Sequence, residues 1–335
     1  MSNVVRTIRE IFGQKTVVIL GDLVADQFLN GTISRVSREA PVFILRHDTT
    51  QTLPGAAANA AVNVASLGGK PILVGFAGCD ASGELLLKEL KESGVECKYV
   101  IADPQQSTTT KIRVLAGQHY AARQQVIRID YENKSEVSAG IKEKLRQNLV
   151  EACCSADAII ISDYDYGAAF PEAIETARAI SKENGIPLLI DSRFRLADFR
   201  NATSATPNRD EVEQILGKNF TPQACSKLRE NLGFEAMLIT NGNEGMLLFE
   251  ENKEPLQIDA VGSSEPVDVT GAGDTVIAVY ALGLASGLSF ADAARVANHA
   301  GGIVVMKKRT AAVTADELVE SIGTLPDILA SEHAN

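Results

Sequence analysis

Short apolar runs alternate along the chain with longer segments in which apolar residues recur at helical spacing. The apolar runs lie at 15–21, 71–78, 156–162, 187–192 and 235–241, and the predicted helices at 55–67, 82–94, up to Ala152 and at 171–183. Continuous apolar runs are typical of parallel strands covered on both faces, and such strands are joined through helices. The sequence therefore predicts an α/β fold in which a mostly parallel sheet lies between two layers of helices.

Two stretches interrupt this alternation. Residues 29–52 and 107–130 are rich in Thr, Val, Ile and Arg, alternate with a period of two, and contain no helical segment. We expect them to form strands outside the main sheet, as a small lid. No linker rich in proline or serine divides the chain, so residues 1–335 are predicted to form a single domain. Exposed edges of the lid strands would favour pairing with a second copy, which predicts a homodimer.

The composition limits the kinds of partner and site that this protein can have. The net charge of -11 argues against nucleic acid, because phosphate contacts need clustered Lys and Arg. The five cysteines are odd in number and lack C-x-x-C spacing, which argues against a zinc site or a disulfide framework and favours a cytoplasmic protein. No apolar run reaches the ~18 residues that span a membrane. The four histidines lack metal-ligand spacing, although His119, in the second lid stretch, is a candidate to touch a substrate.

The run DVTGAGD, at 268–274, precedes a long apolar segment and is the strongest candidate for chemistry. Its glycines allow a tight turn, in which the N–H groups of Gly271, Ala272 and Gly273 would face one point at the start of a helix. Such a terminus attracts an anion or a transferring phosphoryl group. Asp274 would then lie within reach of the attacking group. The alternative is a first-turn acid that the helix dipole favours and that has no catalytic role.

Two common phosphate-binding motifs do not fit. The stretch SLGGKPI has Pro71 where a P-loop needs Ser or Thr, and VVILGDLVAD lacks the G-x-G-x-x-G of dinucleotide folds. A nucleotide would therefore use other parts of the chain. The turn in LITNGNEGM offers Thr240, Gly242 and Gly245 to its phosphates or ribose. The alternative for this turn is an ordinary β-hairpin carried by Asn-Gly.

The run TPNRDEVE carries a helix start with two further functional candidates. Asn208 is predicted to cap the helix, and Glu211, three residues on, completes a capping box. An amide and a carboxylate at this end of the sheet could also hold a hydrated Mg²⁺ through water, because this ion keeps several of its waters.

Polar side chains follow several strands where sugar hydroxyls could bind. Asp22 and Asp26 come just after the first strand, Gly55 and Asn59 stand at a helix start, and Asp163 ends the strand in ISDYDYG. Ligands of open α/β folds bind at the carboxyl edge of the sheet, and Asp and Asn can contact several hydroxyls. Taken singly, each of these residues could instead be a solvated or helix-capping side chain.

Together these runs resemble the PfkB/ribokinase family of carbohydrate kinases over nearly the whole chain and in the same order. DVTGAGD matches the C-terminal signature of that family, TNGNEG its T-x-G-x-x-G element, NRDE its N-x-x-E element and PGAAAN its N-terminal glycine element. Within the family, SRVSREAPVFIL, TTTKIRVL and ISDYDYG are similar to the heptose 7-phosphate kinases of bacterial ADP-heptose synthesis. The resemblance implies a ribokinase-like three-layer αβα sandwich with a β lid.

The resemblance also implies a reaction and a role for each site. The γ-phosphate of ATP would pass to a sugar or sugar-phosphate hydroxyl, with heptose 7-phosphate as the first candidate. Asp274 would be the base and 271–273 the anion hole, and K⁺ or a similar cation is a further candidate ligand. The other implied contacts are Asn208 and Glu211 with magnesium, Thr240, Gly242 and Asn298 with the nucleotide, and Asp26, Gly55 and Asn59 with the sugar. Arg38 and Arg193 are candidates to hold a phosphate on the substrate, because guanidinium groups bind phosphate in bidentate fashion.

Four positions depart from the heptose group. Ala56 and Arg309 stand where that group has glycine, and Tyr166 and Arg193 stand where it has lysine. These departures leave open another sugar, sugar phosphate or nucleoside as substrate, and a non-catalytic sensor on the same scaffold is a rival of another class. No cytidylyltransferase module follows residue 330, so we expect the kinase half of a bifunctional enzyme.

Overall fold

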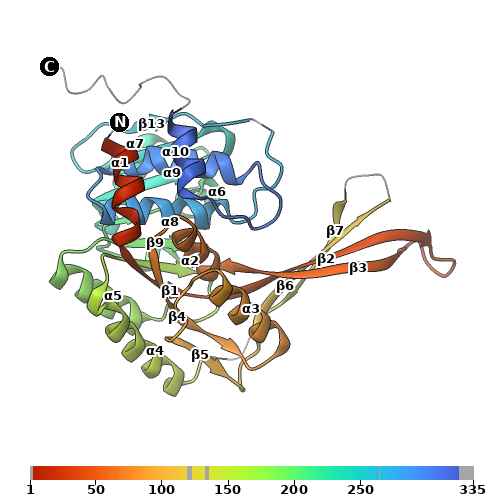
Figure 1. The fold of residues 1–335 in the computed structure, drawn as a ribbon. Helices are drawn as coiled ribbons and strands as arrows, with labels where there is room; N and C mark the ends of the chain where they lie inside the picture. The colour runs from red at the N-terminus through yellow and green to blue at the C-terminus, as the bar shows by residue number, and fades with distance from the viewer. Residues whose placement is uncertain (1–2, 119–122, 133–135, 264, 324–335) are drawn as a thin grey trace.

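A nine-stranded sheet forms the centre of the molecule (Figure 1). The computed structural model describes residues 3–118, 123–132, 136–263 and 265–323. The strand order is β13-β12-β11-β10-β9-β8-β1-β4-β5, and the pairs from β11 to β5 are parallel. The bounds are β1 Thr16–Gly21, β4 Lys70–Gly78, β5 Val100–Asp103, β8 Ala158–Asp163, β9 Leu188–Ser192, β10 Ser204–Ala205, β11 Ala236–Thr240, β12 Met246–Glu250 and β13 Leu256–Ile258.

Helices cover both faces of this sheet, as the apolar runs predict. One apolar core joins it to α1 Asn3–Glu10, α2 Ala57–Ser66, α3 Ala81–Glu92, α8 Ala272–Ala285, α9 Phe290–Val304 and α10 Ala315–Gly323. The other core joins it to α4 Ala139–Ala152, α5 Pro171–Asn184, α6 Arg209–Leu216 and α7 Pro222–Leu232. All six residues of β8 are buried, because helices lie on both of its faces. The predicted three-layer αβα sandwich is confirmed.

A second, four-stranded sheet projects from one side of this body and is called the lid here (Figure 1). Its order is β3-β2-β6-β7, with β2 Leu23–Val36, β3 Phe43–Ala56, β6 Thr109–Gly117 and β7 Gln124–Tyr131. One residue, Asp22, separates β1 in the body from β2 in the lid. Every residue of β7 is exposed. The lid is therefore a single layer of strands, and the helices α2 and α3 contact β2 and β3 at its base.

The structure corrects some boundaries. The lid strands begin at Leu23, earlier than residue 29, because β2 continues directly from β1. The helix predicted from residue 55 begins at Ala57, since the two preceding residues still pair with β2. The predicted capping box of Asn208 and Glu211 is confirmed. Within the described ranges, no helix is long and apolar enough to cross a membrane. The histidine proposed to touch substrate, His119, lies outside the described residues.

Candidate active site

The start of α8 is open to an anion. Gly271 occupies the N-cap position with φ 78°, and no side chain caps the helix. A side chain at Gly271 would meet the Asn59 amide nitrogen at 2.5 Å, whereas one at Gly273 would meet nothing within 4 Å. The turn thus needs glycine at its first position and leaves free space beside its third. A helix start without a side-chain cap fits an oxyanion or a phosphoryl group, and of its N–H groups that of Ala272 donates to the Val269 carbonyl at 3.3 Å.

Asp274 lies directly behind this turn and is 3% exposed. The Asn59 Nδ2 donates to its Oδ2 at 2.8 Å, and the Tyr164 hydroxyl donates to its Oδ1 at 3.0 Å. Burial, with the nearby charge of Asp191 next, raises the pKa of the Asp274 carboxyl to about 8, although the two hydrogen bonds oppose the rise. A carboxyl with a pKa near the working pH suits proton transfer.

Asn59 is held in a buried polar network between α2 and α8. It also donates to the Gly271 carbonyl at 3.3 Å, and its Oδ1 accepts from Asn63 at 3.2 Å. The Thr275 hydroxyl lies 3.1 Å from the Asn63 Oδ1 and completes the link. These contacts fix the glycine turn and Asp274 relative to α2. The Asn59 amide nitrogen is thus engaged with Gly271 and Asp274. The predicted contact of Asn59 with a sugar stays a prediction.

Acidic groups gather at the carboxyl ends of β9 and at the start of α6. Asp191 is the next-to-last residue of β9, and burial, with the charge of Glu211 next, raises its pKa to about 7. Burial also raises the pKa of Glu211 to about 7, although its carboxylate accepts from the Asn208 N–H at 2.8 Å. Carboxylates that disfavour one another's charge fit a site for a cation. No group of three or more His, Cys, Asp or Glu side chains that could hold a metal ion occurs in the described part of the chain.

Sequence reasoning missed Asp191, although a signal was present. It stands at the end of the run PLLIDS, at the same edge of the sheet as Asp163 at the end of β8. Applying the rule that ligands bind at the carboxyl ends of parallel strands to every strand would have included it.

The turn predicted to hold a nucleotide is a tight hairpin. Thr240 ends β11, and 242–244 form a 3₁₀ turn before β12, which is antiparallel to β11. Thr240 also lies beside Asn208 through an isolated β-bridge. This brings two of the predicted nucleotide elements together. Gly245, with φ 85°, lies against the strand that follows, where a side chain would meet the Ile258 carbonyl at 2.1 Å.

Asn298 lies on α9 and is nearly buried. Its Nδ2 donates to the Asp259 carbonyl at 2.7 Å, so it fixes the loop after β13. Its predicted place near adenine stays a prediction.

The base of the lid carries a buried ion pair. The Arg113 Nη2 lies 3.0 Å from the Asp26 Oδ1, and the two side chains are 13% and 7% exposed. Burial raises the pKa of Asp26, against the opposing charge of Arg113. A side chain at Gly55 would meet the Asp26 Oδ2 at 2.6 Å, so the carboxylate can occupy this position only because residue 55 is a glycine. Two residues of the predicted sugar site thus lie together.

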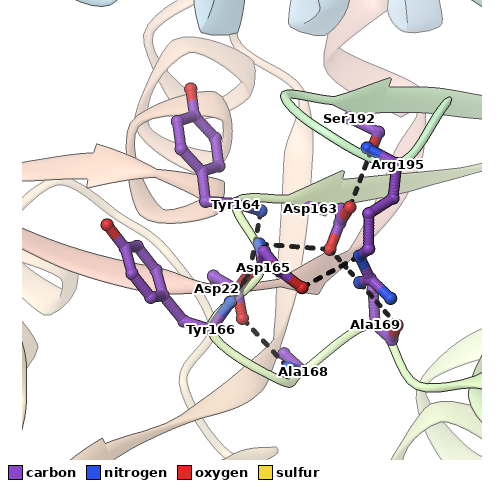
Figure 2. Close-up of polar contacts among 9 residues, drawn as sticks. All are labelled: Asp22, Asp163, Tyr164, Asp165, Tyr166, Ala168, Ala169, Ser192 and Arg195. Atoms are coloured by element: carbon purple, nitrogen blue, oxygen red, sulfur yellow. Dashed lines mark hydrogen bonds and ion pairs between the residues drawn. The ribbon is translucent and has the colours of Figure 1, made fainter. Parts of the chain in front are cut away.

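Two other predicted sugar contacts are engaged inside the protein (Figure 2). Asp22 is 2% exposed and accepts backbone N–H bonds from Tyr164, Tyr166 and Ala168. Asp163 is fully buried, accepts from the Ser192 hydroxyl at 2.7 Å, and pairs with Arg195. Their geometry favours a structural role, and direct contact with a substrate stays a prediction for both.

Two cations from different elements face the same region. Arg193 follows β9, is exposed, and lies near enough to Asp191, Glu211 and Tyr164 to oppose the rise of their pKa values. Lys111, on β6, stands 5.7 Å from the ring centre of Tyr166. Burial lowers the pKa of Lys111, and the positive charge of Arg193 is one of the further causes. Nearby like charges at the mouth of the site fit an anionic group on the substrate.

Both residues that stand in place of glycine have a positive φ. Ala56 has φ 55° and Arg309 has φ 64°, a region that costs a residue with a side chain about 1–3 kcal/mol. The Arg309 guanidinium reaches the lid, where it contacts Gln51, the Asn30 Oδ1 at 3.4 Å and the face of Phe28 at 5.7 Å. The backbone N–H of Arg309 donates to the Asp268 Oδ2 at 2.9 Å, in the run that leads to the glycine turn.

A buried acid behind a glycine turn at a helix start, beside a strand lid, suits the transfer of a phosphoryl group to an alcohol. The chain matches the model of the pfkB family carbohydrate kinases over residues 14–317 and belongs to that family. It is therefore a carbohydrate kinase, in a family whose members use ATP and magnesium.

Curated relatives match most of this chain. The chain is 38% identical over 315 residues to the bifunctional protein HldE of Caulobacter vibrioides and 38% identical over 317 residues to that of Proteus mirabilis. These alignments cover 92% and 93% of this chain but 63% and 64% of the relatives, so the chain spans less than two thirds of their length.

The fold is similar to that of Escherichia coli phosphofructokinase-2, with a TM-score of 0.75 at 18% identity over 92% of this chain and 98% of the other. Arabidopsis thaliana ribokinase, solved with ribose and ATP, gives a TM-score of 0.68 at 22% identity over 92% and 98%. These likenesses show that the fold is ribokinase-like.

Proposed function

We propose that this chain transfers the γ-phosphate of ATP to the anomeric hydroxyl of D-glycero-β-D-manno-heptose 7-phosphate, giving the 1,7-bisphosphate. The observation that carries the choice of sugar is the 38% identity to HldE proteins along 92% of the chain. The two cations at the mouth of the site, Arg193 and Lys111, support a substrate that already bears a phosphate. We place the activity in one cytoplasmic kinase domain.

The chemistry follows from the start of α8. The sugar hydroxyl would give its proton to the Asp274 carboxylate, and its oxygen would attack the γ-phosphorus while the bond to ADP breaks. The N–H groups of the 271–273 turn would stabilise the charge on the transferring group. Positioning of the two reactants supplies most of the rate in such transfers.

Glu211 and Asn208 would hold magnesium through its waters, since they lie beside Asp191 and face the same edge of the sheet. When bound, this ion neutralises phosphate charge. Thr240, Gly242 and Gly245 would contact the nucleotide. A monovalent cation belongs to the proposal because E. coli phosphofructokinase-2, which shares the fold, has been solved in complex with potassium.

A coupled assay of ADP release tests the choice of sugar. Heptose 7-phosphate should give the highest kcat/KM in a panel that includes fructose phosphates, ribose and nucleosides. A response to another member alone would replace heptose with that sugar and keep the kinase. Sugar binding by calorimetry, without ADP formation in the presence of Mg²⁺ and ATP, would favour the non-catalytic sensor.

The lid supplies an interface for a second copy of the chain. Large apolar side chains are exposed on its strands and at their ends: Val36, Val42, Phe43, Val126, Ile127, Ile129 and Tyr131. Covering such a surface is the simplest way to protect an exposed sheet. Sedimentation at micromolar concentration should give a dimer, and Ile127→Ser with Ile129→Ser should give a monomer. A wild-type monomer would contradict the proposal.

A further inference from the structure

The loop between β8 and α5 carries a hydroxyl that the proposed chemistry does not use. Tyr164 donates to the Asp274 Oδ1 at 3.0 Å across 110 residues of sequence. Asn59 donates to the other oxygen of the same carboxylate at 2.8 Å. The carboxylate of the proposed base is therefore held at both oxygens, by groups from two different elements.

The main chain of this loop is fixed by one buried carboxylate (Figure 2). Asp22 Oδ2 accepts from the N–H groups of Tyr164 at 2.8 Å and Tyr166 at 3.1 Å, and its Oδ1 accepts from Ala168 at 2.9 Å. Three bonds to one carboxylate leave the first residue of the loop little freedom. They do so at a cost, because burial raises the pKa of Asp22 to about 6 in spite of them.

A second anchor holds the far side of the loop (Figure 2). Arg195 pairs with Asp163 before the loop, with the Asp165 Oδ1 at 3.0 Å within it, and with the Ala169 carbonyl at 3.1 Å after it. Asp165 has φ 64°, so the backbone is held in a conformation that it would otherwise rarely adopt. A strained loop tied at three points presents its side chains in one arrangement.

The neighbouring tyrosine shows that this arrangement is selective. Tyr166 belongs to the same loop and is tied to the same Asp22, but its hydroxyl donates to the exposed Glu132 at 3.0 Å. Tyr164 alone of the two reaches the proposed base. The chain thus contains its own control for a tyrosine in this loop that does not contact Asp274.

We propose that Tyr164 is a positioning residue for the transfer reaction, and that Asp22 acts through the loop to set its hydroxyl against the Asp274 carboxylate. The inference rests on the proposed role of Asp274 as the base. The Tyr164 hydroxyl fixes the direction of the carboxylate and stabilises its charged form. Each carboxylate oxygen can accept more than one hydrogen bond, so Asp274 keeps the capacity to take the proton of the sugar hydroxyl.

The charged and polar groups around Asp274 determine how its pKa should change when the Tyr164 hydroxyl is removed. The carboxylates of Asp191 and Asp26 disfavour its charge, Asn59 and Tyr164 favour it, and Arg193 lies near Tyr164. Tyr164→Phe removes one favourable contact and keeps the ring. The pKa of Asp274 should therefore rise above its present value, and the base should be charged only at higher pH.

The kinetic test compares Tyr164→Phe with Tyr166→Phe on the best acceptor of the wild-type enzyme. Tyr164→Phe should lower kcat about tenfold with KM nearly unchanged, and should move the acidic limb of the pH–rate profile up by about one unit. Tyr166→Phe should leave the limb in place. A rise in KM without movement of the limb would mean that Tyr164 contacts the sugar, and wild-type kinetics in Tyr164→Phe would also overturn the proposal.

An equilibrium test needs no turnover and therefore separates this inference from the choice of substrate. Because Tyr164 stabilises the charged carboxylate, the loss of thermal stability in Tyr164→Phe should be greater at pH 9 than at pH 6. The loss in Tyr166→Phe should be the same at both, since its partner Glu132 is exposed. Equal losses at both pH values for Tyr164→Phe would overturn the proposal even if the enzyme proved active on heptose 7-phosphate.

Discussion

The proposed base in the body and the buried acid of the lid are held in opposite ways. In the body, the charge of Asp191 helps to raise the pKa of Asp274. In the lid, the buried carboxylate of Asp26 is paired with the cation Arg113. β8 is buried throughout, whereas β7 is exposed throughout.

The difference indicates a division of work. A rigid edge of acids suits proton transfer and a hydrated cation, both of which need fixed geometry. A thin sheet with basic side chains suits the binding of an anionic substrate. Substitutions in the body should therefore change the rate of transfer, and substitutions in the lid should change substrate binding and local stability. The predictions below test that separation.

The largest effect is expected in the body. Asp274→Asn keeps the size of the side chain but cannot take a proton, so kcat should fall by about 10²–10⁴. ATP affinity and hydrogen exchange in the lid should stay as in the wild type. ADP release and calorimetry with ATP measure the two parts. Retention of most of the turnover number would remove Asp274 from the role of base.

The lid should respond to loss of its ion pair. Arg113→Met leaves Asp26 buried without a partner, which costs about 3–5 kcal/mol in comparable pairs. Hydrogen exchange should accelerate in β2 and β6, and KM for the sugar should rise more than kcat falls. The double variant with Asp26→Asn should recover part of the stability. Unchanged hydrogen exchange in β2 and β6 together with a lower kcat would contradict the proposed separation of roles between the body and the lid.

The body should also show a pH dependence that is set by Asp274. The folded pKa of Asp274, about 8, lies above the ordinary value for aspartate, so the folded state binds more protons than the unfolded state between them. Stability from this group is therefore present below about pH 4 and is lost as pH rises towards 8. The wild type should therefore lose stability between pH 5.5 and pH 8.5, and Asp274→Asn should reduce this loss in the free energy of unfolding by ~2 kcal/mol or more. Denaturant unfolding at the two pH values measures this difference.

The smallest effects are expected where the two regions join. Ala56→Gly should relieve its positive φ and stabilise the protein by about 1 kcal/mol. Arg309→Gly relieves a similar φ but removes the contacts with Phe28, Asn30 and Gln51. It should therefore give no net gain in melting temperature and faster exchange in β2. Equal gains from both substitutions would mean that Arg309 does not hold the lid.

The sequence allowed the regular parts of this molecule to be predicted. Apolar runs located the parallel strands, period-two alternation located the lid, and the Asn208 capping box was found as expected. These features depend on residues near one another in the chain, so their patterns can be read directly.

The contacts that define the site depend on topology instead. Tyr164 is 110 residues from Asp274, and Arg113 is 87 residues from Asp26. Nothing in the local sequence distinguishes Tyr164 from Tyr166, because only the fold of the loop decides which hydroxyl reaches the base. Asp22 was predicted to face the substrate for the same reason, since its spacing does not reveal three N–H donors that come from another strand end.

Asp22 has a mechanical consequence that its hydrogen bonds alone do not express. It is the one residue between β1 and β2, so the lid strand β2 begins next to the residue that ties the 164–168 backbone. A movement of β2 would therefore be transmitted to the backbone of Tyr164 through the side chain of Asp22. The lid and the loop that carries Tyr164 are both attached at Asp22, so a substrate that moved the lid would also move this tyrosine.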